Sequence, residues 1–366
     1  MPWQHFTSPL ETWSTLPSFV VGQALFIAGA IVALIHAKKR GRTHLLVWAG
    51  ASIAGTANDL IFIALPLVDN FWHAQANVML TARLPLYIPC VYICFMYYPV
   101  VAVRRLGLPV WSQAGLTGLV AALFYAPYDI TGAKFLWWTW HDTDLTVARR
   151  ILGAPASSTL WVLTFTATFA WLVDKILTHD PEVSGRTFAG GLAAIAASTT
   201  LLMVLQVTLL QQLDGGAPGY AALAGGVAVY AALVWRGVGA ADREKQPTRA
   251  HASDRLLLGW VVAYFAVFVL IVAAFDPATH KSTGVHQQIG ECYVEAKNIT
   301  GLTRHRYLCA TDYSEDFDFA CAGPRVDATW YTMCGRPHSS FGLWMSAVSV
   351  IGVVGSATFW WLLGRP

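Results

Sequence analysis

One histidine and three carboxylates lie close together in the sequence, in a pattern suited to proton transfer. His141 and Asp142 are adjacent, Asp144 follows two residues later, and Asp129 precedes them in the same stretch of chain. Histidine accepts and releases protons near neutral pH, and neighbouring carboxylates raise its pKa. We therefore predict a catalytic group made of His141, Asp142, Asp144 and Asp129. Half of a metal site and a solvated polar loop are the alternatives, and we assign no metal.

Two further charged residues, Asp59 and Arg83, lie in the outer parts of long apolar stretches. A charged side chain in a bilayer costs about 2.5–3.5 kcal/mol on insertion scales, so each one needs an explanation. One explanation is a buried ion pair that holds two helices in register. The other is a substrate-binding pair, in which Arg83 binds a headgroup or another anion and Asp59 orients the arginine.

Tryptophans are concentrated immediately before His141, at Trp137, Trp138 and Trp140. Tryptophan rings commonly lie at the headgroup level of a membrane, so an aromatic belt at the outer interface is one explanation for them. The other is that Trp138 and Trp140 contact a substrate beside the predicted catalytic group. We take these two residues as further candidates for substrate binding.

The composition identifies the environment in which these residues must be positioned. Of the 366 residues, 55% are hydrophobic and only 12% are charged, whereas soluble domains carry about 25% charged residues. So few charges cannot cover the surface of a soluble protein, and the lipid bilayer is therefore the expected partner. A net charge of +3 without a basic patch gives no support to nucleic-acid binding.

A spanning helix needs about 20 predominantly apolar residues, and nine segments of the chain meet this requirement. These segments are Ser18–His36, Leu45–Pro66, Met79–Val103, Ser112–Tyr128, Ser158–Ile176, Thr187–Leu210, Tyr220–Trp235, Leu256–Phe275 and Phe341–Leu363.

The distribution of Lys and Arg predicts how these helices are oriented. If the N-terminus lies outside, the short inner segments and the C-terminal tail hold 14 Lys and Arg residues, whereas the short outer segments hold 3. Cytoplasmic loops of membrane proteins carry the excess of basic residues. We therefore predict an N-terminus outside and a C-terminus in the cytoplasm.

The segment 276–340 carries two signals of an oxidising compartment outside the cytoplasm. The first is a set of four cysteines: Cys292, Cys309, Cys321 and Cys334. The second is the sequon Asn298-Ile299-Thr300, which predicts a glycan on Asn298. Four cysteines allow three disulfide pairings, and the sequence does not choose between them. A zinc site is the alternative for the cysteines, but no C-x₂-C spacing is present.

These observations divide the chain into three parts. Residues 1–275 form an eight-helix transmembrane region, residues 276–340 form a luminal or extracellular loop, and residues 341–366 form the ninth transmembrane helix with a short cytoplasmic tail. The predicted fold is an all-α polytopic integral membrane protein with about nine transmembrane helices and a disulfide-bonded extracytoplasmic loop. The predicted location is a membrane of the secretory pathway, such as the endoplasmic reticulum, or the plasma membrane.

Motifs of well-known enzyme classes are missing from the sequence. There is no P-loop, no H-E-x-x-H and no G-x-S-x-G motif. No lysine lies in the middle of a predicted helix, which argues against a retinal Schiff base. The motifs therefore assign no cofactor and do not decide between an enzyme and a binding protein.

The stretch from Asp129 to Trp161 resembles part of the membrane-bound carotenoid hydratase and carotenoid biosynthesis proteins. An aspartate at a helix end precedes the tryptophans, and the run Gly153-Ala154-Pro155 then leads to Trp161. Ser158 stands where that family has asparagine, and the spacing is one residue shorter. The resemblance implies an isoprenoid or lipid substrate that enters from the membrane. The whole chain is also similar to uncharacterised eukaryotic multipass proteins known as a domain of unknown function, which implies no activity.

Three functions follow as expectations. The first is an enzyme or binder acting on an isoprenoid or other lipid at the outer or luminal leaflet, at a site built from the polar residues named above. The second is a cell-surface or structural protein whose disulfide-bonded loop binds partner proteins. The third is a transporter, although the polar residues do not line both halves of the bilayer.

Overall fold

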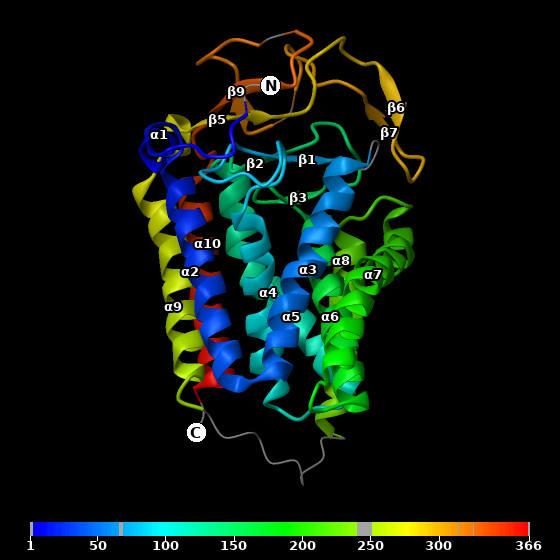
Figure 1. The fold of residues 1–366 in the computed structure, drawn as a ribbon. Helices are drawn as coiled ribbons and strands as arrows, with labels where there is room; N and C mark the ends of the chain where they lie inside the picture. The colour runs from blue at the N-terminus through cyan, green and yellow to red at the C-terminus, as the bar shows by residue number, and fades with distance from the viewer. Residues whose placement is uncertain (1–2, 66–68, 240–250, 314, 325, 365–366) are drawn as a thin grey trace.

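The structure is a computed structural model, and it describes residues 3–65, 69–239, 251–313, 315–324 and 326–364. The predicted helix end at Pro66 and the last two residues of the predicted tail lie outside this range. Figure 1 shows a bundle of helices with a layer of loops and short strands over one end. Within the described residues, a short helix α1 (Pro9–Thr15) precedes nine long ones. The long helices are α2 (Pro17–Arg40), α3 (Arg42–Ala64), α4 (Tyr87–Arg104), α5 (Val110–Lys134), α6 (Ala156–His179), α7 (Gly185–Leu210), α8 (Tyr220–Gly239), α9 (Asp254–Ala274) and α10 (Phe341–Leu363).

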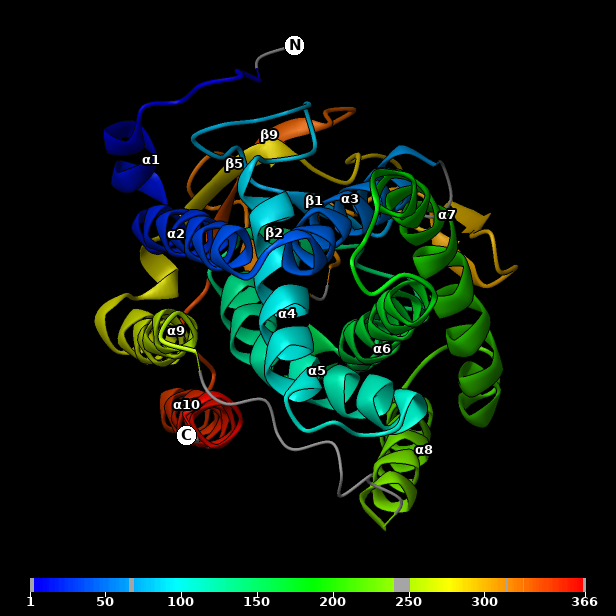
Figure 2. The same ribbon diagram turned by 60° about the horizontal axis from the view of Figure 1, so that its bottom comes forward.

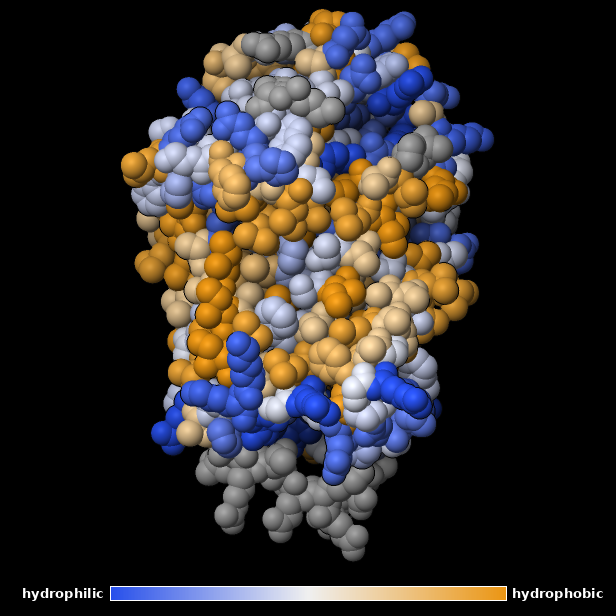
Figure 3. All heavy atoms as spheres, in the orientation of Figure 1, coloured by the Kyte–Doolittle hydropathy of each residue, from blue (hydrophilic) through white to orange (hydrophobic). Residues whose placement is uncertain are grey.

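The helices have the composition of a membrane protein. Eight of the nine long helices in the described part of the chain are long and apolar enough to cross a membrane. The exception is α5, which packs against α4, α6, α8 and α10 (Figure 2) and buries polar side chains such as Gln113 and Thr117 among its neighbours. A helix surrounded by protein does not need the apolar surface that lipid requires. Figure 3 shows a belt of hydrophobic residues between two hydrophilic ends, as expected for a bundle that spans a bilayer.

Two helix boundaries differ from the prediction. Helix α4 begins at Tyr87 and not at Met79. Pro85 and Pro89 disfavour helical backbone in the residues before them, and Met79 instead forms an isolated β-bridge with Pro85. Helix α5 continues to Lys134, more than one turn past its predicted end.

The end of the bundle that carries the N-terminus is covered by a layer that we call the cap, made of the described residues of 69–86, 135–155 and 276–340 (Figure 1). The all-α prediction holds for the bundle but not for the cap, whose segments pair as strands. These strands are β1 (Phe71–His73), β2 (Trp138–Trp140), β3 (Arg150–Ile151), β4 (Ala154–Pro155), β5 (Lys281–Val285), β6 (Glu295–Lys297), β7 (Thr303–His305), β8 (Phe317–Asp318) and β9 (Trp330–Gly335). Two 3₁₀ turns complete the elements: η1 (Gln211–Asp214), which follows α7, and η2 (Pro277–Thr279) in the cap.

The strands join segments that are far apart in the sequence. β1 pairs antiparallel with β2, so that Phe71 lies opposite Trp140 and His73 opposite Trp138. β9 lies between β5 and β8 in a three-stranded sheet. A bridge between Ala74 and Gly284 connects the first pair to this sheet. The segment 276–340 is therefore packed onto the bundle and is not a free loop.

The tryptophans do not form an aromatic belt. Trp137 is fully buried and Trp138 is only 3% exposed. The ring of Trp137 lies so close to Gly22 that a Cβ atom at residue 22 would be 2.4 Å from it, and Trp138 lies in the same way against Gly132. The glycines make room for the rings inside the protein, and the indole groups hold the cap to α2 and α5.

The cap contains two disulfides, Cys292–Cys309 and Cys321–Cys334. The predicted oxidation of the four cysteines agrees with the structure, which excludes the zinc alternative and selects one of the three pairings. Each disulfide closes a short loop, and such a crosslink typically contributes about 2–4 kcal/mol to folding.

We expect peptide mapping without reduction to find these two pairs, and replacing Cys321 and Cys334 by serine to lower the Tm of the purified protein. A peptide that joins Cys292 to Cys321 or Cys334 would contradict this arrangement.

Candidate functional site

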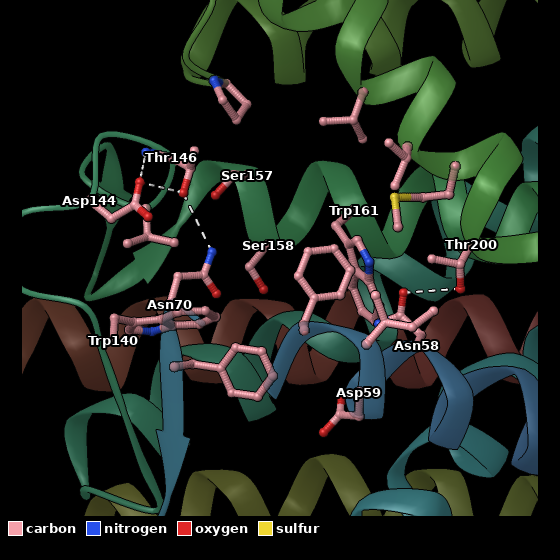
Figure 4. Close-up of a pocket in the computed structure, with 18 of the residues that line it drawn as sticks. Asn58, Asp59, Asn70, Trp140, Asp144, Thr146, Ser157, Ser158, Trp161 and Thr200 are labelled. Atoms are coloured by element: carbon pink, nitrogen blue, oxygen red, sulfur yellow. Dashed lines mark hydrogen bonds between the residues drawn. The ribbon is translucent and has the colours of Figure 1, made fainter. Parts of the chain in front are cut away.

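The half of the bundle next to the cap encloses a cavity of about 360 Å³. Its walls come from α3, α4, α5, α6 and α7, and the cap closes its end. Figure 4 shows Asn58 and Asp59 on α3, Trp161 on α6 and Thr200 on α7 around this space, with Trp140 from the cap beside them. Most lining residues are apolar or aromatic, and the volume falls within the range of small-molecule sites.

The cavity opens sideways between two helices. Ile61 on α3 and Leu65 just after this helix line the cavity and are also 40% and 47% exposed on the surface of the protein. Val204 on α7, which lines the cavity too, is 41% exposed, and Ile299 of the cap is 69% exposed. Residues that line a cavity and are also exposed mark its mouth. This mouth lies among apolar residues of helices long and apolar enough to cross a membrane.

A chain of hydrogen bonds forms the polar part of the cavity wall. The Tyr92 hydroxyl donates to Asp59 Oδ1 at 2.6 Å, and His73 Nε2 lies 3.3 Å from Asp59 Oδ2. Asn58 Nδ2 donates to the Tyr92 hydroxyl at 3.3 Å, and its Oδ1 accepts from Thr200 at 3.3 Å. All five residues line the cavity. Asp59, which the sequence predicts to lie in an apolar segment, is thus held by the neutral Tyr92 hydroxyl and by His73.

Arg83 does not pair with Asp59, so the ion pair expected from the sequence is not formed. Its guanidinium donates to the backbone oxygens of Ile63 at 2.6 Å and Phe71 at 2.9 Å. The same group lies over the ring of Trp72, 5.3 Å from the centroid. Arg83 is not among the residues that line the cavity. The arginine therefore fixes the start of β1 to the end of α3, and it is poorly placed to bind an anion.

Asp144 lines the cavity, but its oxygens are occupied by other protein groups. Oδ1 accepts from the Thr146 backbone at 2.9 Å and from Asn298 Nδ2 at 3.2 Å. Oδ2 forms an ion pair with Arg304 at 3.1 Å, and Arg304 also reaches Asp69 at 3.0 Å. Asp144 and Arg304 are both buried. This network joins three segments of the cap.

His141 and Asp142 do not line the cavity. Nδ1 of His141 accepts from the backbone N–H groups of Thr143 at 3.2 Å and Asp144 at 3.1 Å. Burial, and secondarily the charge of Arg304, lowers the pKa of His141 to about 3, so the expected rise next to carboxylates is wrong. Asp142 exchanges two hydrogen bonds with Gln287. Both residues thus shape the loop, and neither side chain faces the cavity.

Asp129, on the last turns of α5, is 1% exposed and lies behind the cavity wall. Neither carboxylate oxygen makes a hydrogen bond of good geometry among the described residues, and Ser158 is its polar neighbour. The four predicted catalytic residues are therefore not assembled around one space.

The structure brings together a different set from the one predicted. Asp59, Asp144, Trp138 and Trp140 line the cavity, as do residues that sequence reasoning missed. His73 is the most important of these. It lies on a three-residue strand without a periodic pattern, and only its position opposite Trp138 across β1 and β2 reveals it.

The folded position of Asn298 does not support the predicted glycan. Its side chain is 6% exposed, and Nδ2, the atom to which a glycan is attached, donates to buried Asp144. Its Oδ1 accepts from the backbone N–H and the hydroxyl of Thr300.

We expect glycosidase treatment to leave the electrophoretic band of the protein unchanged. We also expect Asn298→Ala to cost about 1–3 kcal/mol, because partners of a buried amide are left unsatisfied. A glycosidase shift that Asn298→Ala abolishes would contradict this assignment.

Among the described residues, no group of three or more His, Cys, Asp or Glu side chains is arranged to hold a metal ion. Comparisons with curated proteins and with solved structures find no match. A family model described as a domain of unknown function, DUF7802, matches residues 3–363. This match confirms the expected similarity over the whole chain, and nothing in it supports the local resemblance to carotenoid proteins. The chain belongs to the DUF7802 family.

Proposed function

We propose that the protein binds one lipid or isoprenoid molecule in the cavity of its outer half. The observation that carries this proposal is the mouth between α3 and α7, where Ile61, Leu65 and Val204 face the cavity and the exterior at once. A mouth among apolar residues admits a ligand that is already dissolved in the membrane. A mostly apolar wall with a few polar groups is the usual construction of a small-molecule site. Binding, with or without a reaction, is therefore the proposed activity.

The cap supports this proposal over partner binding by a free loop. Asn298, Ile299 and Thr300 of the segment 276–340 contribute to the cavity wall. The strand β5 of the same segment connects to the region of β1 through the bridge between Ala74 and Gly284. The segment therefore closes the cavity on the side of the strands and separates a ligand from water.

The packing of the opposite half argues against a pathway across the membrane. Below the cavity, Phe165 on α6 stacks on Trp161 with ring centroids 5.0 Å apart. Phe169 and Ile195 pack against Gly50 of α3. Nearer the end opposite the cap, Nδ1 of His36 lies 2.7 Å from the Tyr97 hydroxyl, and Nε2 of His36 lies 2.9 Å from Asp254. Apart from Trp161, which lines the cavity, these residues are buried. A site closed on this side fits a binder better than a transporter.

We propose that the cap faces the lumen or the exterior and that the C-terminus faces the cytoplasm. The basic residues in the last turns of α2 and α4 lie at the end opposite the cap, where α10 also ends (Figure 1). The two disulfides of the cap fit an oxidising compartment. A tag fused after Pro366 should resist protease added from the outside, and its digestion would reverse the orientation.

The test is lipid analysis of protein purified in mild detergent, with two matched variants of α7. Val204→Trp fills the mouth, whereas Leu205→Trp adds the same ring at a neighbouring exposed residue that does not line the cavity. Overfilling a packed site costs about 1–3 kcal/mol, so we expect about tenfold less of a specific co-purified lipid with Val204→Trp. Leu205→Trp should retain the lipid. Equal amounts in both variants, or no enriched lipid in the unmodified protein, would overturn the proposal.

A further inference from the structure

Three cavity-lining side chains hold buried polar atoms without a hydrogen-bond partner among the described residues: His73, Trp138 and Trp140. His73 is 5% exposed and Trp138 is 3% exposed. Nδ1 of His73 and Nε1 of Trp138 are buried and have no hydrogen-bond partner among the described residues. Leaving a buried polar group unsatisfied is costly, and each instance in a folded protein needs an explanation. A ligand in the cavity that these side chains line is one such explanation.

His73 and Trp138 are neighbours on paired strands. His73 lies directly opposite Trp138 across β1 and β2, and their ring centroids are 6.5 Å apart. The other nitrogen of His73 is engaged by Asp59, which also accepts from Tyr92. A carboxylate at Nε2 fixes the ring and keeps a proton on that nitrogen. Nδ1 of the neutral ring is then a hydrogen-bond acceptor.

The unpartnered atoms are therefore one acceptor, on His73, and two donors, on Trp138 and Trp140, since an indole N–H only donates. A hydroxyl group matches these roles, because its O–H donates to His73 and its oxygen has two lone pairs that accept from an indole such as that of Trp138. A carboxylate or an ether oxygen accepts from Trp138 but offers no hydrogen to His73, and an ammonium donates to His73 but cannot accept from Trp138.

The charge of the cavity excludes an anionic group for a separate reason. Among the residues that line it, Asp59 and Asp144 are acidic and none is Lys or Arg. Arg83, which the sequence suggested as a binder of anions, does not line the cavity, and its two terminal nitrogens donate to backbone oxygens. A phosphate or a fatty-acid carboxylate would enter this space next to Asp59 without a compensating cation, at a high desolvation cost.

From these contacts we infer that the ligand is a neutral lipid alcohol, such as a prenol or a sterol, whose hydroxyl is bound by His73 and Trp138. This inference rests on the proposed function and specifies its ligand class. His73 and Trp138 are then the residues that determine specificity. Asp59 and Tyr92 are positioning residues that act on the ligand through His73.

The experiment uses the full-length protein in nanodiscs and four photoactivatable probes with one prenyl chain. The probes carry a hydroxyl, a methyl ether, a carboxylate or an amine at the same end. One lost hydrogen bond to a buried group costs about 1–3 kcal/mol, which corresponds to a preference of about 5- to 150-fold. We expect the alcohol to label α3, α7 or the cap most strongly by that factor. Equal labelling by all four probes overturns this inference and leaves the proposed function intact, whereas absence of cavity labelling by any probe overturns both.

Variants identify the recognising residues. His73→Gln removes the ring that accepts the hydroxyl hydrogen, so it should reduce the preference of alcohol over methyl ether to near unity. Trp138→Phe removes an indole donor that the ammonium cannot use, so it should reduce the preference of alcohol over amine. The matched control is Trp171→Phe, which removes another indole nitrogen without a partner on α6, outside the cavity lining. This control should keep the preference for the alcohol over the other probes. If a cavity variant fails to fold, the preference of the unmodified protein still decides the ligand class. An undiminished preference in folded Trp138→Phe and His73→Gln overturns the assignment of the two residues.

Discussion

Arg304→Met is expected to destabilise the protein by about 3–5 kcal/mol, because it leaves a buried carboxylate without its counter-charge. Arg304 bonds to Asp144 at 3.1 Å, and Asp144 is 2% exposed. Arg304 also donates to the backbone oxygen and the side chain of Asp69. The loss should appear as a lower Tm and as faster proteolysis of the cap.

The control for this prediction is Arg336→Met. Arg336 is 52% exposed and lies 3.8 Å from Asp318, and exposed ion pairs contribute only about 0–1 kcal/mol. The double variant with Arg304→Met and Asp144→Asn should recover part of the stability, since the deeply buried negative charge is then removed as well. A Tm for Arg304→Met equal to that of Arg336→Met would show that the network does not hold the cap.

Acidification is expected to destabilise the cap between about pH 6.5 and pH 4. Burial lowers the pKa of His141 and of His286 to about 3, and that of His280 to about 4. As the pH falls, the unfolded chain takes up protons at these rings before the folded protein does. The folded state is therefore not penalised by these rings above about pH 6.5, and it loses stability as the pH falls below that value. Each ring contributes a slope of about 1.4 kcal/mol per pH unit. Burial raises the pKa of Asp142 and Glu315, which offsets part of the loss.

The slope is measured from unfolding curves of the purified protein at a series of pH values. His286→Gln removes one buried ring and should reduce the slope by about 1.4 kcal/mol per pH unit. His179→Gln, at the exposed end of α6, should leave the slope unchanged. A slope that is the same in both variants would mean that His286 does not take up a proton on unfolding.

The helices of the bundle could be predicted from the sequence because lipid imposes a local rule. A spanning segment must satisfy its own backbone and present apolar side chains over its length, so composition alone identifies it. Helix α5 shows where this rule stops: it is surrounded by other helices, and its polar residues are buried by protein. The start of α4 shows a second limit: the apolar run begins at Met79, but prolines disfavour helical backbone before them, and the helix begins only at Tyr87.

The candidate site could be predicted only where one residue by itself was anomalous. Asp59 was identifiable because a carboxylate in an apolar segment is costly. His141 was chosen for its neighbours in the sequence, yet it is turned into the loop and bonds to the backbone. His73 had no local signal, although the structure places it on Asp59.

The sequence by itself determined that this is a helical protein with several helices long and apolar enough to cross a membrane, and with an oxidised segment before its last helix. These properties depend on composition and residue counts, which do not change with folding. Only the tertiary structure decided that Cys292 pairs with Cys309, that Trp138 is buried, and that His73 faces the same cavity as residues of α3 and α7. Each of these depends on contacts between segments far apart in the chain. Such contacts are selected by packing and by the pairing of buried polar groups, and neither can be read from neighbouring residues.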